Sequence, residues 1–151
     1  MNAIECYDII GAFDVIEHIY DDTTALLNMA KAIRPGGRII LTVPQHPWLW
    51  SMADQFSYHQ RRYSRTEISR KLKDVGCEVT YATSFVSLLV PLMLIYRSLT
   101  PEHSYDPMSE FTISPFLNLI LNTIMNIEII LVKAGVSFLV GGSLLVIARK
   151  I

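Results

Sequence analysis

The chain has 151 residues, a length typical of a single domain. Its formal net charge of −1 provides no positive field for nucleic acid, and its two isolated cysteines provide no disulfide framework, which is consistent with a reducing cytosol. The hydrophobic fraction of 51% and the mean hydropathy of +0.34 are high, which predicts an exposed sheet edge, a partner or a membrane surface.

The chain begins with a strand–helix–strand pattern. Residues 7–13 are a short apolar run of the length expected for a buried strand. The next helix is expected from Thr23 to Ile33, because apolar residues recur there at three- and four-residue spacing. Asp21 and Asp22 precede it, where acidic side chains cap free amides and oppose the helix dipole. The Pro-Gly-Gly sequence at residues 35–37 ends this helix.

Residues 38–44 are the second expected strand. Short connections predict that the two strands are parallel neighbours, with Ile9 beside Ile40 in one layer. In an open α/β sheet, ligands bind just beyond the carboxyl ends of the strands. Those ends are Phe13-Asp14 and Pro44-Gln45-His46, so we expect the functional site between them.

Several short motifs follow one another in a recognisable order. They are Phe13-Asp14-Val15-Ile16-Glu17-His18, Arg34-Pro35-Gly36-Gly37, Leu41-Thr42-Val43-Pro44, His59-Gln60-Arg61-Arg62-Tyr63-Ser64, Gly76-Cys77-Glu78-Val79 and a closing strand at residues 141–148. In this order the chain resembles the second half of a class I S-adenosylmethionine-dependent methyltransferase. The resemblance implies an α/β, partial Rossmann-like fold. Its sheet would be mostly parallel, with an antiparallel last strand and an added helical segment.

Methyltransferases of this class carry a glycine-rich loop and a ribose-binding acidic residue upstream of the strand that begins here at Tyr7. The resemblance therefore implies that residues 1–151 form a single, N-terminally truncated methyltransferase domain, with residues 85–140 as a helical insertion before the last strand. The whole protein would transfer a methyl group from S-adenosylmethionine to a small-molecule or lipid-like acceptor by in-line displacement. The alternative is a non-catalytic remnant whose exposed sheet edge binds a partner chain, a second copy or a membrane surface.

The resemblance also assigns roles to individual residues. Cofactor contacts fall to Ala12, Phe13, Asp14 and His18. Substrate contacts fall to Gln45, His46, Trp48, His59, Arg62 and Tyr63. The catalytic residue is not identified, although His18, His46 and His59 are positioned to act as a base if the acceptor is protonated. His18 is expected to shape the cofactor site rather than to act as a base, and Asp14 either contacts cofactor or caps the helix beginning at Val15.

Three local patterns each allow a structural and a functional interpretation. Trp48 and Trp50 either cover the sheet end or line the substrate pocket, where an aromatic face attracts a sulfonium by about 0.5–2 kcal/mol. Glu17 and His18 resemble a metal-binding pair, but adjacent residues on a helix diverge and no third ligand is spaced to join them, so no metal is predicted.

The third pattern is a basic cluster. Ser64 and Glu67 form a capping box at the start of a helix, and six of the thirteen basic residues fall between residues 61 and 73. They either form a solvated helix face, or Arg61 and Arg62 bind an anionic substrate group through their planar guanidinium groups. The patch is too short to predict a nucleic-acid partner.

Two apolar stretches follow. Residues 84–96 are shorter than the roughly 20 residues that cross a bilayer and are interrupted by Pro91. A helix expected at residues 113–133 has one narrow polar stripe and would be costly in lipid, so it either packs within its own domain or forms an interfacial helix or lid. Peripheral membrane contact would use residues 85–99 and 113–133. The expected localisation is cytoplasmic, with membrane association as the alternative.

Overall fold

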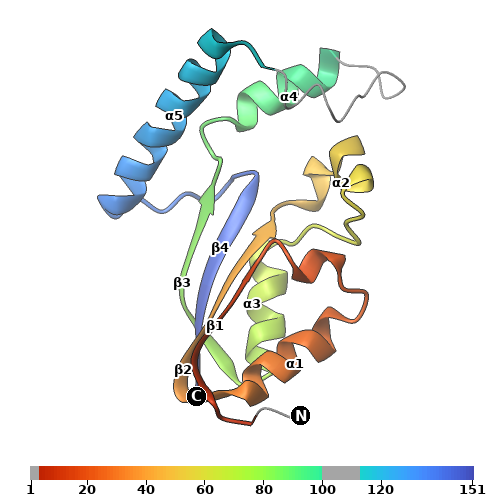
Figure 1. Cartoon of the computed structure of the whole chain (residues 1–151), viewed down its shortest axis with the longest axis vertical. Helices are drawn as coiled ribbons and strands as arrows, with labels where there is room; N and C mark the ends of the chain where they lie inside the picture. The colour runs from red at the N-terminus through yellow and green to blue at the C-terminus, as the bar shows by residue number, and fades with distance from the viewer. Residues whose placement is uncertain (1–3, 100–112) are drawn as a thin grey trace.

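The computed structural model describes residues 4–99 and 113–151, and it forms a four-stranded mixed sheet. Helices α1 and α3 cover one face of the sheet, and α4 and α5 lie beyond one end (Figure 1). The strands are β1 (Tyr7–Phe13), β2 (Ile33–Pro44), β3 (Cys77–Phe85) and β4 (Ser143–Lys150). The helices are α1 (Asp22–Ala32), α2 (Met52–Phe56), α3 (Arg65–Asp74), α4 (Val90–Leu99) and α5 (Pro115–Lys133), with 3-10 turns η1 (Ile16–His18) and η2 (Pro47–Leu49). Part of the predicted helical insertion, residues 100–112, lies outside the described residues.

The strand order is β1-β2-β4-β3. β1 and β2 are parallel, while β4 is antiparallel to both of its neighbours, β2 and β3. This confirms a mostly parallel arrangement with an antiparallel last strand inserted beside the previous one. Ile9 pairs with Arg38 and Gly11 pairs with Ile40, so the predicted neighbouring strands are correct and their register is offset by two residues.

Helix α1 is capped as predicted but ends earlier than expected. The Asp21 carboxylate accepts a hydrogen bond from the Thr24 amide at 3.0 Å. Ile33 is already extended and begins β2. Pro35 disfavours helical geometry in Arg34, the residue before it, so the helix ends ahead of that residue. A side chain on Gly37 would come within 2.9 Å of a β1 carbonyl, so this glycine lets the start of β2 run close beside β1.

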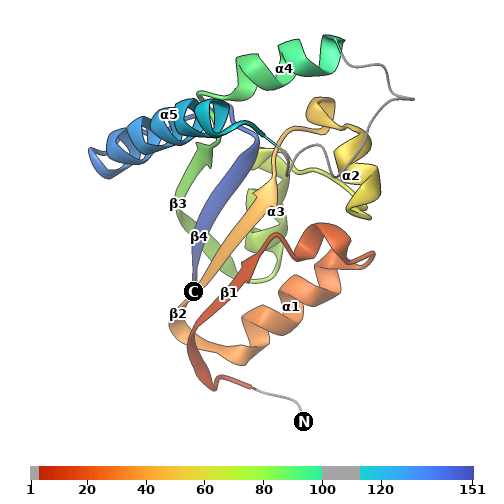
Figure 2. The ribbon, with the colours of Figure 1, turned by 45° about the horizontal axis from the view of Figure 1, so that its top comes forward.

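One face of the sheet holds the core. Fully buried side chains alternate along β2 and β4 and pack against buried side chains of α1 and α3. Figure 2 shows these two helices on one face of the sheet. The buried side chains include Leu26, Ile39, Leu41, Val43, Ile68, Leu72, Leu144 and Val146. The outer strand β1 instead leaves Tyr7, Ile9 and Phe13 between 51% and 61% exposed. Within the described part of the chain, β1 pairs with a strand on one side only, so the predicted exposed sheet edge is present.

The helical segment departs from the sequence prediction in two ways. β3 continues to Phe85, and α4 begins at Val90, so Pro91 lies in the first turn, where a missing amide costs little. Helix α5 packs little against the rest of the described chain, because only 6% of its candidate membrane-spanning window is buried. With 19 residues and a mean hydropathy of 1.7, α5 is long and apolar enough to cross a membrane. Its buried Glu128 accepts hydrogen bonds from the amides of Ser87 and Leu88 at 2.7 and 2.8 Å.

Candidate functional site

The carboxyl ends of β1 and β2 lie next to each other. Phe13 pairs with Thr42, and the Asp14 amide then donates to both the carbonyl and the hydroxyl of Thr42 at 3.1 Å. Asp14 has a positive φ of 50°, a conformation that aspartate tolerates better than most residues. Turn η1 begins after Val15 without a side-chain cap, so the predicted capping role of Asp14 is wrong. Its exposed carboxylate and the 61% exposed ring of Phe13 are presented at the strand end.

Asp54 is the centre of a polar network that the sequence analysis missed. It is 1% exposed, and its Oδ1 accepts from Arg62 Nε at 2.8 Å and contacts His59 Nδ1 at 2.9 Å. Its Oδ2 accepts from the Ser51 amide at 2.8 Å. Burial alone would raise the pKa of Asp54, but the hydrogen bonds from Arg62 and His59 outweigh it and lower the pKa. The capping-box spacing of Ser51 and Asp54 was the available sequence signal.

The segment before α3 runs beside the end of β2. The amide of Tyr63 donates to Pro44, and the amide of His46 donates to Tyr63, which gives a short parallel bridge. Neighbouring side chains in such an extended segment point to opposite sides. Tyr63 therefore enters the core, where it is fully buried, and Arg62 points toward Asp54 and the Gln45 carbonyl.

These positions correct two predicted substrate contacts. The Tyr63 hydroxyl donates to Asp22 Oδ2 at 2.7 Å and contacts no open surface. The Arg62 side chain is 8% exposed and its guanidinium group is engaged by Asp54 and by backbone carbonyls. Arg61 likewise binds the Tyr20 carbonyl at 2.7 Å and Asp22 at 3.1 Å. All three side chains connect loops to the core, so none is free to bind an anionic substrate group in this conformation.

Asp22 is the buried acceptor that Tyr63 and Arg61 share. It is 2% exposed and also accepts a hydrogen bond from Lys71 Nζ at 2.8 Å. Burial tends to raise the pKa of Asp22, but the hydrogen bonds from Lys71 and Tyr63 lower it below its ordinary value. Burial and the Asp22 carboxylate raise the pKa of the Tyr63 phenol. The sequence suggested a capping role for Asp22, whereas the structure makes it an ion-pair centre between α1 and α3.

His46 and Trp48 lie at the open side of the β2 end. Their ring centroids are 5.1 Å apart, and Trp48 is 57% exposed. Burial, and then the nearby charge of Arg62, lower the pKa of His46, which favours the neutral imidazole. The buried Nε2 atom of His46 has no hydrogen-bond partner among the described residues. Gln45 is 1% exposed and donates to the Leu139 carbonyl at 3.3 Å, so it supports the site from behind.

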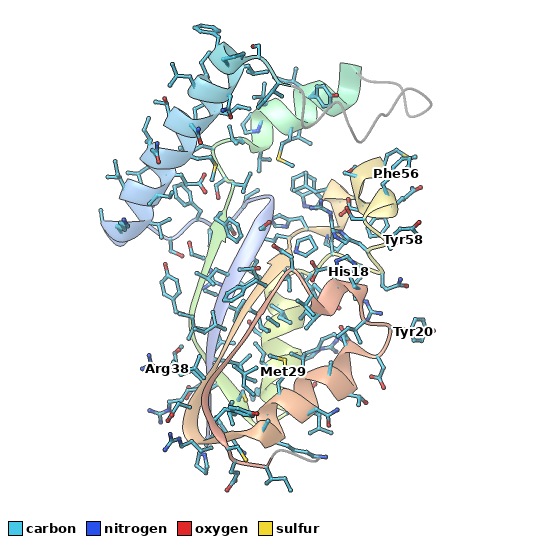
Figure 3. All side chains as sticks on the ribbon, viewed as in Figure 1. His18, Tyr20, Met29, Arg38, Phe56 and Tyr58 are labelled. Carbon is cyan, nitrogen blue, oxygen red and sulfur yellow. The ribbon has the colours of Figure 1, made fainter. Side chains whose placement is uncertain are left out.

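Glu17, His18 and His59 meet on the other side of the site. The ring centroids of His18 and His59 are 4.8 Å apart in an edge-on arrangement, and Glu17 Oε1 lies 4.0 Å from His18 Nε2. Figure 3 shows His18 beneath the segment that carries Phe56 and Tyr58. The predicted lack of a third group near the Glu17–His18 pair is therefore wrong. His59 supplies it through the loop after α2.

A hollow of about 330 Å³ lies elsewhere, at the amino end of β3. It is lined by Ser69, Lys73, Cys77, Glu78, Val79 and Ile151. The carboxyl ends of β1 and β2 contribute nothing to it, and ligands of parallel α/β sheets bind at those carboxyl ends. We therefore place the candidate site at the ends of β1 and β2, where the predicted cofactor residues and His18, His46, Trp48 and His59 gather.

Solved structures with a similar fold include methyltransferases. A methyltransferase of Haloferax volcanii, solved with the Trm112 methyltransferase activator, is 15% identical; the alignment covers 97% of this chain and 55% of that one, with a TM-score of 0.56. A sarcosine dimethylglycine methyltransferase from Galdieria sulphuraria is 20% identical, with 97% and 54% covered and a TM-score of 0.54.

A third similar structure contains ligands. Phosphoethanolamine N-methyltransferase 2 of Haemonchus contortus, in complex with phosphomonomethylethanolamine and S-adenosylhomocysteine, is 16% identical; 97% of this chain and 34% of that one are covered, with a TM-score of 0.52. The chain thus spans little more than half the length of the first two structures. At these identities the likeness shows the fold.

A search of curated protein sequences returned no match. A family profile described as "Methyltransferase domain" matches residues 5–82, which is just over half of the chain. The matched range runs from the start of β1 through α3 into β3, and so includes both strand ends that frame the site. This chain therefore belongs to the methyltransferase domain family and has the Rossmann-like fold of class I methyltransferases.

Proposed function

We propose that this protein transfers a methyl group from S-adenosylmethionine to a small-molecule or lipid-like acceptor. The observation that carries the proposal is that β1 and β2 end next to each other: Phe13 pairs with Thr42, and His46 and Trp48 follow the end of β2. The family membership supports the reaction class. The N-methyltransferase neighbour solved with S-adenosylhomocysteine supports the cofactor.

The end of β1 fits the cofactor in chemical character. Phe13 offers an exposed aromatic ring, and Asp14 offers an exposed carboxylate that can accept hydrogen bonds from amino or hydroxyl groups. Ala12 lies between them and the core, and His18 is 40% exposed at the next turn. These four residues would hold the cofactor, which supplies an electrophilic methyl group on a sulfonium leaving group.

The remaining task of the chain is to orient the acceptor and to exclude water. Good alignment of reactants contributes roughly 7–11 kcal/mol to lowering a barrier. Trp48 offers an exposed aromatic wall for an apolar acceptor. The neutral imidazole of His46, with an unpartnered Nε2, is suited to accept a proton from an acceptor hydroxyl or amine, which contributes about 10²–10⁴-fold.

Titration calorimetry of the purified chain with S-adenosylmethionine tests the cofactor assignment. Binding in the micromolar range supports the proposal, and Asp14→Ala is expected to weaken it. Arg149→Ala serves as the control, because that exposed residue lies far along β4. A chain that folds cooperatively but does not bind S-adenosylmethionine, alone or when extended upstream, contradicts the assignment.

A second function is favoured by the exposed apolar surfaces. The outer edge of β1 leaves Ile9 and Phe13 more than half exposed, and α5 exposes Phe116 and Ile130 by 73% and 64%. A non-catalytic module would use the edge for a partner chain or a second copy, and α4 and α5 for a membrane surface. The neighbour solved in complex with a methyltransferase activator supports a protein partner. Vesicle flotation tests binding to a membrane surface, and light scattering tests association with a second copy. This alternative predicts a cytoplasmic protein of which a part is recruited to membranes.

A further inference from the structure

Glu17 is a buried carboxylate in the turn that follows β1. Its side chain is fully buried, and neither Oε1 nor Oε2 has a hydrogen-bond partner among the described residues. Leaving an ionised carboxylate in such a place is costly. Buried charges are normally paired or coordinate a metal ion. The fold positions this group firmly, since η1 follows directly from the end of β1.

Two imidazoles face the same point. One ligand atom each from Glu17, His18 and His59 lie within 4.8 Å of one another. The Nδ1 atom of His59 is engaged by Asp54 at 2.9 Å, which leaves Nε2 as the nitrogen able to bind a ligand. A carboxylate on the second nitrogen is the usual partner of a metal-bound histidine, because it fixes the tautomer and the ring orientation.

We propose that Glu17, His18 and His59 form a binding site for a divalent transition-metal ion such as Zn²⁺. One carboxylate and two imidazoles are a ligand set that zinc uses when a further position stays open for water or substrate. Zinc binds such ligands at about 2.0–2.2 Å, so atoms separated by at most 4.8 Å need to move by less than about 1 Å each. His18 is 40% exposed and gives an ion access from solvent.

Methyl transfer by in-line displacement does not require a metal ion at this site. Metal binding here is therefore independent of the proposed function. An acceptor oxygen bound at the open coordination position of the ion would lie beside the predicted cofactor residues at the end of β1. The ion would also bind the buried Glu17 carboxylate, which has no hydrogen-bond partner in the described part of the chain. We therefore expect metal binding to stabilise the turn η1 against the loop that carries His59.

The test uses the full chain without an affinity tag, stripped with a chelator and titrated with Zn²⁺ by calorimetry. We expect one ion per chain. A parallel titration with Co²⁺ should give visible d–d absorption of a nitrogen- and oxygen-ligated ion. His18→Gln should weaken binding by more than about 100-fold, since losing a residue that merely orients a ligand already costs about 10–100-fold. Glu17→Gln should do the same.

Glu78→Gln is the matched control, because it makes the same carboxylate-to-amide change at an exposed position at the amino end of β3, outside the cluster. It should bind Zn²⁺ like the original chain. Circular dichroism melting checks each variant, and if Glu17→Gln does not fold, the more exposed His18→Gln decides the question. Absence of stoichiometric Zn²⁺ binding, or binding that His18→Gln leaves unchanged, overturns the proposal.

Discussion

Replacing Asp22 with asparagine should destabilise the fold strongly. The Asp22 carboxylate is 2% exposed and faces Lys71 Nζ at 2.8 Å, Tyr63 Oη at 2.7 Å and Arg61 Nη1 at 3.1 Å. Breaking a buried ion pair costs about 3–5 kcal/mol, because the remaining charge stays unpaired. Lys71 and Arg61 retain some solvent contact, at 17% and 27% exposure. We therefore expect Asp22→Asn to lower the free energy of unfolding by about 2–3 kcal/mol.

Urea denaturation of the two chains measures this difference, with Asp21→Asn as the matched control. The control makes the same chemical change one residue earlier, at an exposed helix cap. Asparagine and aspartate are nearly equal as caps, so the control should change stability by less than about 0.5 kcal/mol.

The effect of Asp22→Asn should also depend on pH in one direction. The folded state holds the pKa of Asp22 below its ordinary value of 3.8, so the carboxylate contributes stability that is fully present above the unfolded pKa. That contribution is lost as the pH falls through the folded pKa. The stability gap between the two chains should be constant near pH 7 and should narrow below about pH 4. A gap below 0.5 kcal/mol at pH 7, or one that persists unchanged in acid, would refute the reasoning.

Three further predictions can be checked with similar measurements. Leu26→Ala should cost about 2–5 kcal/mol of unfolding free energy in urea, while Leu27→Ala, at a 38% exposed position, should cost under about 1 kcal/mol; equal losses contradict the core assignment. Gly141→Ala should cost at least about 1–3 kcal/mol, because its Cβ would lie 2.4 Å from a backbone carbonyl, whereas Gly142→Ala meets ordinary contacts and should melt close to the original temperature. Glu128→Ala should speed amide exchange at Ser87 and Leu88, just before α4, by releasing these two amides, and unchanged exchange there would argue against the observed hydrogen bonds.

The sequence was informative where structure depends on neighbouring residues. Apolar periodicity and short connections predicted two parallel strands joined by a helix, and the structure confirms them as β1, α1 and β2. The caps at Asp21 and Ser64 were readable for the same reason, since each acts on an amide three residues away. The register was harder to predict, because apolar residues occur on both faces of these strands and do not fix the offset.

The site depended on contacts between distant parts of the chain. His59 lies 41 positions after His18, and only the packing of the loop after α2 against η1 brings their rings together. Tyr63 and Arg62 carry chemistry typical of a binding site, but an extended segment beside β2 directs one into the core and the other onto Asp54.

The sequence by itself determined the strand–helix–strand unit, the resemblance to methyltransferases and the strand ends at which a ligand belongs. These follow from periodicity, local caps and motif order, which are properties of neighbouring residues. The tertiary structure decided that β4 lies between β2 and β3, that Asp22 and Asp54 are buried ion-pair centres, and that the buried Glu17 lies close to two imidazoles. Such features arise when segments far apart in the chain exclude water together, and no local pattern records which segments will meet.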